Sequence, residues 1–250
     1  MKKILFTICG RAGSKGIKNK NIRSFCNHPL PYYTLSAIDL FLRRHSGYEY
    51  RIVLNTDCEE LIELINNNNM QPVKIIKRNP ELTGDYVGKI DVVRDCLEKM
   101  EQKCNTKFDA VVDCDITSPL RIVEDINKLL SVHFSKNPDV TFSVTTARRN
   151  PYFNQVIRTD KGVKKVISSN YTARQQAPEI FDMNASLYAF NPDFLRSGKG
   201  VLDGYCEVIE MYDTAVLDLD HENDFELMEV IANYLFTHNY DFKEIKEHIG

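Results

Sequence analysis

Short apolar segments alternate with amphipathic ones along the first half of the chain. The apolar segments are rich in Ile, Val and Leu, as in buried strands, and the amphipathic ones carry apolar residues at helical spacing. The predicted strands cover residues 1–9, 51–55, 73–77, 108–114 and 139–146, and the predicted helices cover 30–44, 58–66, 89–100 and 123–134. We therefore predict an α/β fold with a doubly wound, mostly parallel sheet in a single domain, residues 1–250.

The pattern changes in the middle of the chain. Residues 152–167 alternate around Thr159-Asp-Lys-Gly162, which is typical of a β-hairpin. We expect a small subregion, about residues 147–175, to project from the domain; a dimerisation arm, a substrate lid and a surface decoration all fit it. The chain is then predicted to return through strands at 185–190 and 212–219 and to close with a helix at 222–236.

Composition restricts the class of protein. A chain of 250 residues with 43% hydrophobic residues can bury one sizeable core. The formal net charge of −3 gives no general attraction to nucleic acid, and no segment approaches the roughly 20 apolar residues of a membrane span. Seven cysteines without a C-x-x-C pair indicate reduced thiols, so we expect a cytoplasmic protein. The charge and the short apolar segments lead us to expect neither nucleic-acid nor membrane partners.

A glycine-rich, basic segment directly follows the first predicted strand. Its glycines allow the backbone to approach a ligand closely, and its cations can neutralise phosphate oxygens. These residues are Gly10, Gly13 and Gly16 with Arg11, Lys15, Lys18 and Lys20. The glycine spacing fits neither a Walker A loop nor a dinucleotide fingerprint. We interpret the segment as a polyphosphate site, with an exposed basic turn as the alternative.

Two aspartates near the carboxyl end form a second candidate site. Asp218 and Asp220 are two residues apart, so on an extended backbone their side chains point to one face and can share a cation. Magnesium prefers such hard oxygen ligands together with phosphate oxygens. A solvated turn, or an N-cap role for Asp220 before the last helix, is the alternative.

Polar groups also gather after the predicted strand at 108–114. In an open parallel sheet, the carboxyl ends of the strands face the ligand crevice. Asp113 and Asp115 are two residues apart there, and Thr117 and Ser118 add hydroxyl groups. Ser118 and the following proline also suit the start of the next helix, so both capping and ligand contact are expected.

An irregular polar stretch combines Arg174 and Gln175 with Asn184 and Ser186. A guanidinium group can clamp a carboxylate and amides can bind hydroxyl groups, so these residues suit a polyhydroxylated acid; a polar surface loop is the alternative. The six histidines lack metal-ligand spacing, and the sequence has no recognisable Ser-His-Asp or Cys-His set. Hydrolytic chemistry with a protein nucleophile is therefore disfavoured.

The glycine-rich segment, GRAGSKGIKNKNI, resembles the nucleotide-binding motif of the CMP-sialic acid synthetases, the cytidylyltransferases for nine-carbon acidic sugars. Later segments resemble further motifs of that family in the same order: LNTD (54–57), KRNPEL (77–82), ITSPLR (116–121), RQQAP (174–178), MNASLY (183–188) and LDLD (217–220). The resemblance covers nearly the whole chain and is closest to the bacterial branch that activates legionaminic acid.

The resemblance implies a reaction and a set of site residues. The anomeric hydroxyl of a 2-keto-3-deoxy sugar acid would attack the α-phosphate of CTP in line, and pyrophosphate would leave, with Mg²⁺ as cofactor. Lys20 and Arg11 would be catalytic. The implied nucleotide-binding residues are Arg11, Ala12, Gly13, Ser14, Lys15, Asn21 and Arg78; the implied sugar-binding residues are Asp115, Thr117, Ser118, Arg174, Gln175 and Asn184; the implied metal ligands are Asp218 and Asp220.

One position departs from the family that the chain resembles. The sialic acid enzymes usually have Gln where this chain has Asp115, so an acceptor-only carboxylate replaces an amide and should change which hydroxyl or acylamino pattern is preferred. The resemblance also implies a homodimer formed through the projecting hairpin. A Kdo-type synthetase, which activates an eight-carbon sugar acid, is the enzymatic alternative, and a nucleotide sensor without turnover is the alternative from another class.

Overall fold

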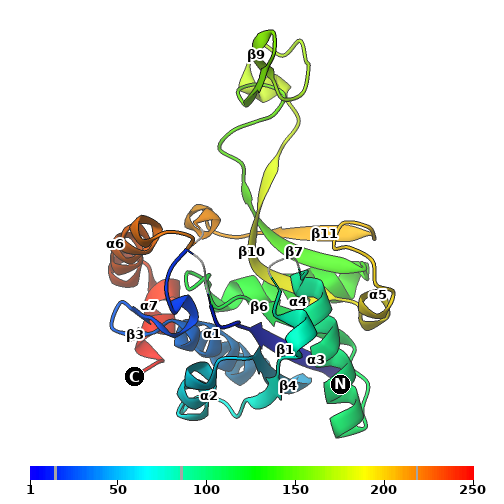
Figure 1. The fold of residues 1–250 in the computed structure, drawn as a ribbon, viewed down its shortest axis with the longest axis vertical. Coiled ribbons are helices and arrows are strands. Elements are labelled where there is room, and N and C mark those ends of the chain that lie inside the picture. Colours follow the sequence, from blue (N-terminus) through cyan, green and yellow to red (C-terminus); the bar gives the residue numbers. More distant parts are fainter. Residues whose placement is uncertain (14–15, 85–86, 218) are drawn as a thin grey trace.

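The computed structural model describes residues 1–13, 16–84, 87–217 and 219–250. A sheet with helices on both faces forms the body of the molecule, and a long excursion projects away from it (Figure 1). The described strands of this sheet lie in the order β11-β7-β10-β6-β1-β4-β5. Their bounds are β1 (Lys2–Cys9), β4 (Tyr48–Thr56), β5 (Lys74–Lys77), β6 (Ala110–Cys114), β7 (Val140–Thr146), β10 (Phe181–Phe190) and β11 (Cys206–Glu210).

Most strand pairs in the sheet are parallel. β1 pairs in parallel with β4 and β6, β4 with β5, and β11 with β7. β10 runs antiparallel to both of its neighbours, β6 and β7. The predicted α/β fold with a mostly parallel sheet is therefore confirmed.

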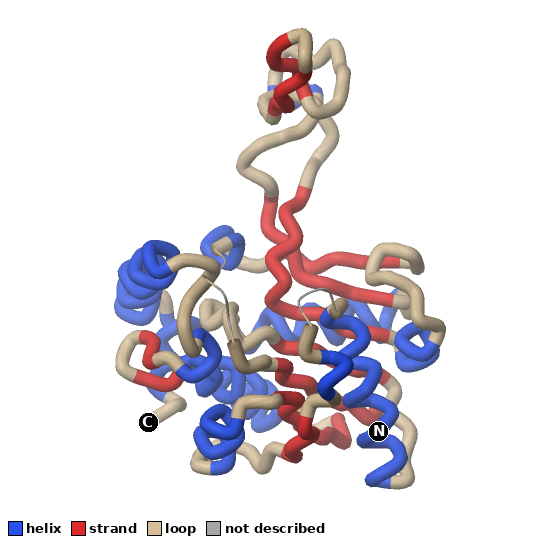
Figure 2. The backbone as a smooth tube through the Cα atoms, viewed as in Figure 1, coloured by secondary structure: helices blue, strands red, loops and turns tan. Residues whose placement is uncertain are grey.

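Helices cover both faces of the sheet, as the tube in Figure 2 shows. The α-helices of the described chain are α1 (Leu30–Arg44), α2 (Glu59–Asn66), α3 (Lys89–Cys104), α4 (Val123–Lys136), α5 (Pro192–Arg196), α6 (Glu222–His238) and α7 (Tyr240–Glu247). Two β-ladders lie outside the main sheet: β2 (Ser24–Phe25) with β3 (His28–Pro29), and β8 (Val156–Thr159) with β9 (Gly162–Lys165). Helices α5 and α7 were not predicted from the sequence.

The apolar character of β1 follows from its position between two cores. Ile4, Phe6 and Ile8 belong to the core that contains residues of α1, α4 and α6, whereas Leu5 belongs to the core beneath α3. Successive side chains of a strand point to opposite faces, so a strand covered on both faces is apolar at nearly every position. This double burial explains why the first strand could be predicted from its continuous apolar run.

The order of the strands defines a ligand crevice. The chain continues from β1 to β4 and β5 on one side, and it returns to place β6 on the other side of β1. Open α/β sheets bind ligands outside the carboxyl ends of their strands at such a reversal of strand order. The basic loop after β1 and the polar segment after β6 therefore meet at this edge.

The predicted strand at 212–219 is wrong. The edge strand is β11, Cys206–Glu210, and the 3-10 helix η4 (Asp213–Val216) follows it. The amide of Met211 donates the last sheet hydrogen bond, to the carbonyl oxygen of Val144, before the chain turns into η4. The apolar residues there pack into the core from a helical turn, which a short apolar run does not distinguish from a strand.

Two predicted helix caps are also wrong. Helix α4 begins at Val123, and its N-cap is Ile122, whose amide donates to Asp125 at 2.9 Å. Ser118 thus lies upstream of the helix start. Helix α6 has His221, not Asp220, at its N-cap, and the amide of His221 donates to Asp224 at 2.8 Å. In both helices the aspartate at the third helical position accepts a hydrogen bond from the amide of the N-cap residue, so the start of the helix is stabilised from within its first turn.

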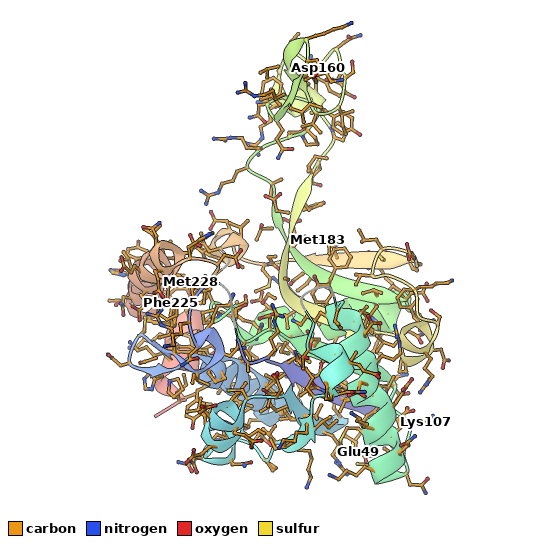
Figure 3. All side chains as sticks on the ribbon, in the orientation of Figure 1. Glu49, Lys107, Asp160, Met183, Phe225 and Met228 are labelled. Carbon is orange, nitrogen blue, oxygen red and sulfur yellow. The ribbon has the colours of Figure 1, made fainter. Side chains whose placement is uncertain are left out.

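Residues 147–180, which we call the arm, connect β7 to β10 and project from the body. The arm contains the β8–β9 hairpin, in which Thr159 pairs with Gly162 as the turn sequence predicted. Figure 3 shows Asp160 at the far end of the arm and Met183 near its return to the body. In the part of the chain that the structure describes, no helix is long and apolar enough to span a membrane.

Candidate active site

The loop after β1 packs against the carboxyl-terminal part of the chain. A Cβ atom on Gly16 would lie 1.8 Å from the carbonyl oxygen of Asp220, so only glycine allows this backbone contact. Gly13 has a φ of +72°, in the left-handed region that favours glycine. Ser14 and Lys15 lie outside the described residues. The described part of the loop thus brings the basic and the acidic candidate segments into contact.

Lys20 links these two segments directly. Its ammonium group donates to the carbonyl oxygen of Leu219 at 2.5 Å and lies 3.7 Å from Oδ1 of Asp220. The Lys20 side chain is 17% exposed, whereas that of Asp220 is 69% exposed. An exposed carboxylate beside a basic, glycine-rich loop fits Mg²⁺, which takes its remaining ligands from water and phosphate. The other predicted ligand, Asp218, lies outside the described residues.

Hydrogen bonds fix the beginning of the loop. The amide of Ala12 donates to Oδ1 of Asp57 at 2.7 Å, and the side-chain amide of Asn21 donates to the carbonyl oxygen of Arg11 at 3.0 Å. Asp57 directly follows β4, which neighbours β1 in the sheet. The loop is therefore anchored to the ends of two adjacent strands.

A cavity of about 300 Å³ opens between these segments. Its described lining consists of Cys9, Arg11, Lys20, Asn21, Arg78, Leu82, Gly84, Val87, Lys89, Val92, Asp115 and Thr117. A second cavity, of about 160 Å³, shares Arg11, Lys20 and Asn21 with the first and adds Ala12 and Gly13. The first cavity has the volume of a small-ligand site. The structure thus brings all of the described nucleotide-binding candidates to two adjoining cavities.

Arg78, the first residue after β5, is held in place by Asn55 of β4. Its Nε donates to Oδ1 of Asn55 at 2.8 Å, and its Nη2 donates to the Asn55 carbonyl oxygen at 3.2 Å. These acceptors are neutral, so they orient the guanidinium group without cancelling its charge. Together with Arg11 and Lys20, Arg78 gives the first cavity a cationic rim.

Lys89 is a cavity residue that we did not predict. It is the first residue of α3, and its ammonium nitrogen lies 2.7 Å from Oδ2 of Asp113 and 2.5 Å from Oδ2 of Asp115. Burial lowers the pKa of Lys89, but the two carboxylates outweigh burial and raise it. In the sequence Lys89 is an ordinary polar residue of an amphipathic helix, and only the fold brings it to the end of β6.

Asp115 is bound on both carboxylate oxygens. Its Oδ1 accepts hydrogen bonds from the amide and the hydroxyl of Thr117, both at 2.7 Å, and its Oδ2 contacts Lys89. Burial raises the pKa of Asp115, but Lys89 and the bonds from Thr117 outweigh it and lower the pKa to about 2. Asp115 is thus an ionised, acceptor-only carboxylate with an ammonium donor, Lys89, beside it.

The arm carries two of the predicted sugar-binding residues away from this cavity. Arg174 and Gln175 lie in the 3-10 helix η3 (Arg174–Gln176), within the projecting part of the chain. Arg174 donates to the carbonyl oxygen of Ala147 at 3.0 Å. Both residues are exposed and lie outside the described lining of the cavity in the same chain.

Two further sugar-binding candidates are buried in the body. Asn184 is 3% exposed, and its Oδ1 accepts a hydrogen bond from Oγ of Ser143 at 2.6 Å. It lies next to Ala185, whose φ of +53° accompanies a register shift in β10. Ser118 is 8% exposed and lies outside the described cavity lining. The structure does not bring either side chain to the first cavity.

A family model described as cytidylyltransferase matches residues 5–237. The chain belongs to the cytidylyltransferase family. Post-translational flagellin modification protein B of Campylobacter coli is 36% identical over 232 residues, which cover 92% of this chain and 95% of that protein. The CMP-N,N′-diacetyllegionaminic acid synthase of Campylobacter jejuni is 34% identical over 234 residues, which cover 93% and 96%.

The fold of this cytidylyltransferase is also found in a solved structure, that of CMP:2-keto-3-deoxy-manno-octonic acid synthetase in complex with CTP. The two structures superpose with a TM-score of 0.65, and the aligned region covers 93% of this chain and 99% of the other. At 13% sequence identity this likeness concerns the fold alone. The predicted family resemblance and the predicted class, a CTP-dependent nucleotidyltransferase, are confirmed by the family match and by the two relatives.

Proposed function

We propose that this cytidylyltransferase transfers CMP from CTP to the anomeric hydroxyl of a nine-carbon 2-keto-3-deoxy sugar acid of the legionaminic or sialic acid type. The observation that carries the proposal is the contact between the basic loop and the acidic segment, through Lys20 and Asp220. The names of the two relatives above support the sugar class, since one is a diacetyllegionaminic acid synthase and the other modifies flagellin.

The chemistry follows from the charges around the cavity. A bond forms between the anomeric oxygen and the α-phosphorus, the bond from that phosphorus to pyrophosphate breaks, and the hydroxyl proton is lost. Lys20 and Arg11 would neutralise the phosphate oxygens, and Arg78, which lines the same cavity, would bind the nucleotide. Fixed cations supply most of the catalysis in such displacements, because the protein does little covalent chemistry.

We propose that Asp218 and Asp220 hold Mg²⁺. When bound there, the ion would neutralise phosphate charge and help to orient the triphosphate. The exposed carboxylate of Asp220 beside Lys20 supports this assignment.

We further propose a cytoplasmic homodimer whose arm completes the site of its partner. Arg174 and Gln175 lie in the arm, away from the cavity of their own chain. To contact an acidic sugar, they would therefore have to reach the cavity of a second copy. The exposed apolar side chains of the β8–β9 hairpin support an interface there. Val156 is 61% exposed and Val163 is 64% exposed, and Ile157 on the same hairpin is 40% exposed, so the apolar side chains gather on one small element.

The test is pyrophosphate release from CTP and Mg²⁺ with a panel of sugar acids. We expect release with nine-carbon acids and much slower release with an eight-carbon acid. Preference for the eight-carbon acid would support the Kdo-type alternative. CTP binding without release, whichever sugar acid is supplied, would support a sensor and contradict the proposed reaction.

A further inference from the structure

Lys89, Asp113 and Asp115 form a charged cluster beside the 300 Å³ cavity. The ammonium group of Lys89 bridges the two carboxylates at 2.7 and 2.5 Å. The side chain of Lys89 is 34% exposed, whereas those of Asp113 and Asp115 are 1% and 19% exposed. Lys89 and Asp115 both line the cavity. The lysine is therefore the member of the cluster that is most accessible to a ligand.

Further hydrogen bonds hold both carboxylates in fixed orientations. Oδ1 of Asp113 accepts from the hydroxyl of Thr7 at 2.7 Å, and Oδ1 of Asp115 accepts twice from Thr117. The backbone of Asp115 is fixed as well, because Arg121, only 1% exposed, donates to its carbonyl oxygen at 3.0 Å. Groups held so firmly on β1, β6 and α3 form a preorganised surface.

The cluster presents a donor beside an acceptor. An ammonium group has three N–H donors, and Lys89 donates one of them to Oδ2 of Asp115 at 2.5 Å, while Asp113 lies at ion-pair distance. A donor of Lys89 is then left for the cavity. Each carboxylate oxygen has two lone pairs, so Oδ2 of Asp115 can accept from a ligand while it contacts Lys89.

The charge of the cluster disfavours phosphate directly beside it. One lysine and two aspartates carry a formal net charge of −1, whereas the other charged residues in the described lining are the cations Arg11, Lys20 and Arg78. Like charges repel strongly in a partly buried site. The apolar side chains of Leu82, Val87 and Val92 line the same cavity. The cluster therefore suits a neutral group with hydrogen-bonding edges and apolar faces.

We propose that Lys89 and Asp115 act as a specificity-determining pair that binds a neutral, amide-type group of a substrate, in which an acceptor atom stands beside an N–H donor. The inference rests on the proposed function, whose substrates carry such a group in two places. One is the edge of the cytosine base of CTP, and the other is an acylamino substituent of the sugar acid. Uracil reverses the donor and acceptor of cytosine, and a hydroxyl in place of the acylamino group lacks its carbonyl oxygen.

The experiment compares kcat/KM ratios of the wild type with those of Lys89→Met and Asp115→Asn. One arm measures CTP against UTP, and the other measures an acylamino sugar acid against its hydroxylated counterpart. We expect both variants to lower the same one of these ratios by roughly tenfold or more, because a charged hydrogen bond to one substrate is lost. A ratio within one enzyme preparation is independent of the fraction that is folded, so a purely structural role would leave both ratios unchanged.

Lys107→Met is the matched control. Lys107 also bonds a largely buried carboxylate, that of Glu101, at 2.7 Å, but it precedes β6, whereas Asp115 follows this strand at its other end. Both ratios should stay within about twofold of the wild type in this variant. Should Lys89→Met fail to fold, Asp115→Asn still carries the test, because its Lys89–Asp113 ion pair remains.

Three outcomes are distinguishable. A change in one ratio supports the proposal and identifies the substrate group that is bound. An active wild type with both ratios unchanged in folded variants overturns the pair while leaving the proposed function intact. An inactive wild type contradicts the proposed function, and the same ratios are then measured as binding affinities by calorimetry, where unchanged ratios again overturn the pair.

Discussion

The body and the arm of this cytidylyltransferase differ most in what they bury. The body buries charged side chains: Asp113 and Arg121 are each 1% exposed. Exposed apolar side chains also occur on the body, such as Val230 at 69%, but the hairpin of the arm gathers several on two short strands, with Val156 at 61% and Val163 at 64%. Buried charges are uncommon in soluble proteins unless they are paired.

The difference indicates what each region binds. Buried charges in the body have partners in the described structure, as Arg121 has in the carbonyl oxygens of Asp115 and Ser186, at 3.0 and 2.7 Å. Arg121 does not line the cavity itself but holds the backbone of Asp115, which does. The arm is a two-stranded hairpin, which cannot bury an apolar face by itself. The body is thus suited to a polar small molecule, and the arm to a protein surface.

The strongest test of this contrast is Lys20→Ala. We expect turnover to fall by roughly 10³-fold, because a cation directed at the reacting phosphate is removed. The fold should be retained, since the contacts of Lys20 with Leu219 and Asp220 lie at the cavity rim. Pyrophosphate release and thermal unfolding measure the two effects. Lys161→Ala, at the exposed hairpin turn, is the control, and a near-normal rate for Lys20→Ala would remove Lys20 from the catalytic residues.

The double substitution Val156→Asp with Val163→Asp should affect assembly. Placing two carboxylates on an apolar interface should raise the dimer dissociation constant by roughly a hundredfold, because apolar contacts are lost and charges are desolvated. Sedimentation equilibrium measures the change. Lys161→Asp introduces a carboxylate at the turn and should leave assembly nearly unaltered. A wild type that is monomeric at micromolar concentration would contradict the assigned role of the arm.

Asp220→Asn should have a smaller effect, on the metal requirement. We expect the Mg²⁺ concentration for half-maximal activity to rise by about tenfold, since an amide oxygen replaces a charged ligand. A magnesium titration of the initial rate measures this shift. Asp213→Asn is the matched control, because Asp213 is also exposed and pairs with Arg148 at 3.0 Å. If Asp220→Asn and Asp218→Asn both leave the metal dependence unchanged, other residues must bind the cation.

The parts of the body that could be predicted from sequence are those in which a short run of residues reflects its own place in the fold. The continuous apolar run of β1 reflects burial on both faces, and the glycines after it reflect the close approach of Gly16 to Asp220. The resemblance to the family motifs predicted the cavity residues Arg11 and Arg78. These features are encoded within short windows of the chain.

Other features depend on contacts between distant segments. Lys89 reaches the cavity only because α3 begins beside the end of β6, and Asn184 bonds Ser143 only because β10 pairs with β7. The segment 212–219 is as apolar as a strand, but β11 already occupies the sheet edge. No local pattern carries such information, so these positions could not be predicted from sequence.

Substituting Asp125 should give the smallest of these effects, and its sign shows directly whether a buried charge destabilises the body. It is 3% exposed and accepts a hydrogen bond from the amide of Ile122, and burial raises its pKa to about 6. Because the folded pKa lies above the usual value, the charged form destabilises the fold, and stability is lost as the pH rises from about 4 to 6. Asp125→Asn should therefore be more stable than the wild type at pH 7.5, by about 1 kcal/mol, since losing the charged hydrogen bond offsets part of the gain.

The effect of ionisation on stability has opposite signs for Asp125 and for Asp115, the carboxylate that lines the cavity. Asp115 has a lowered pKa, so its charge stabilises the fold above about pH 4, and Asp115→Asn should lower the unfolding free energy at pH 7.5. Urea unfolding at pH 4 and pH 7.5 measures both variants. The advantage of Asp125→Asn should disappear at pH 4, where the wild-type carboxyl is protonated in the folded state. A variant that is destabilised equally at both pH values would mean that the hydrogen bond at the start of α4 outweighs the cost of the buried charge.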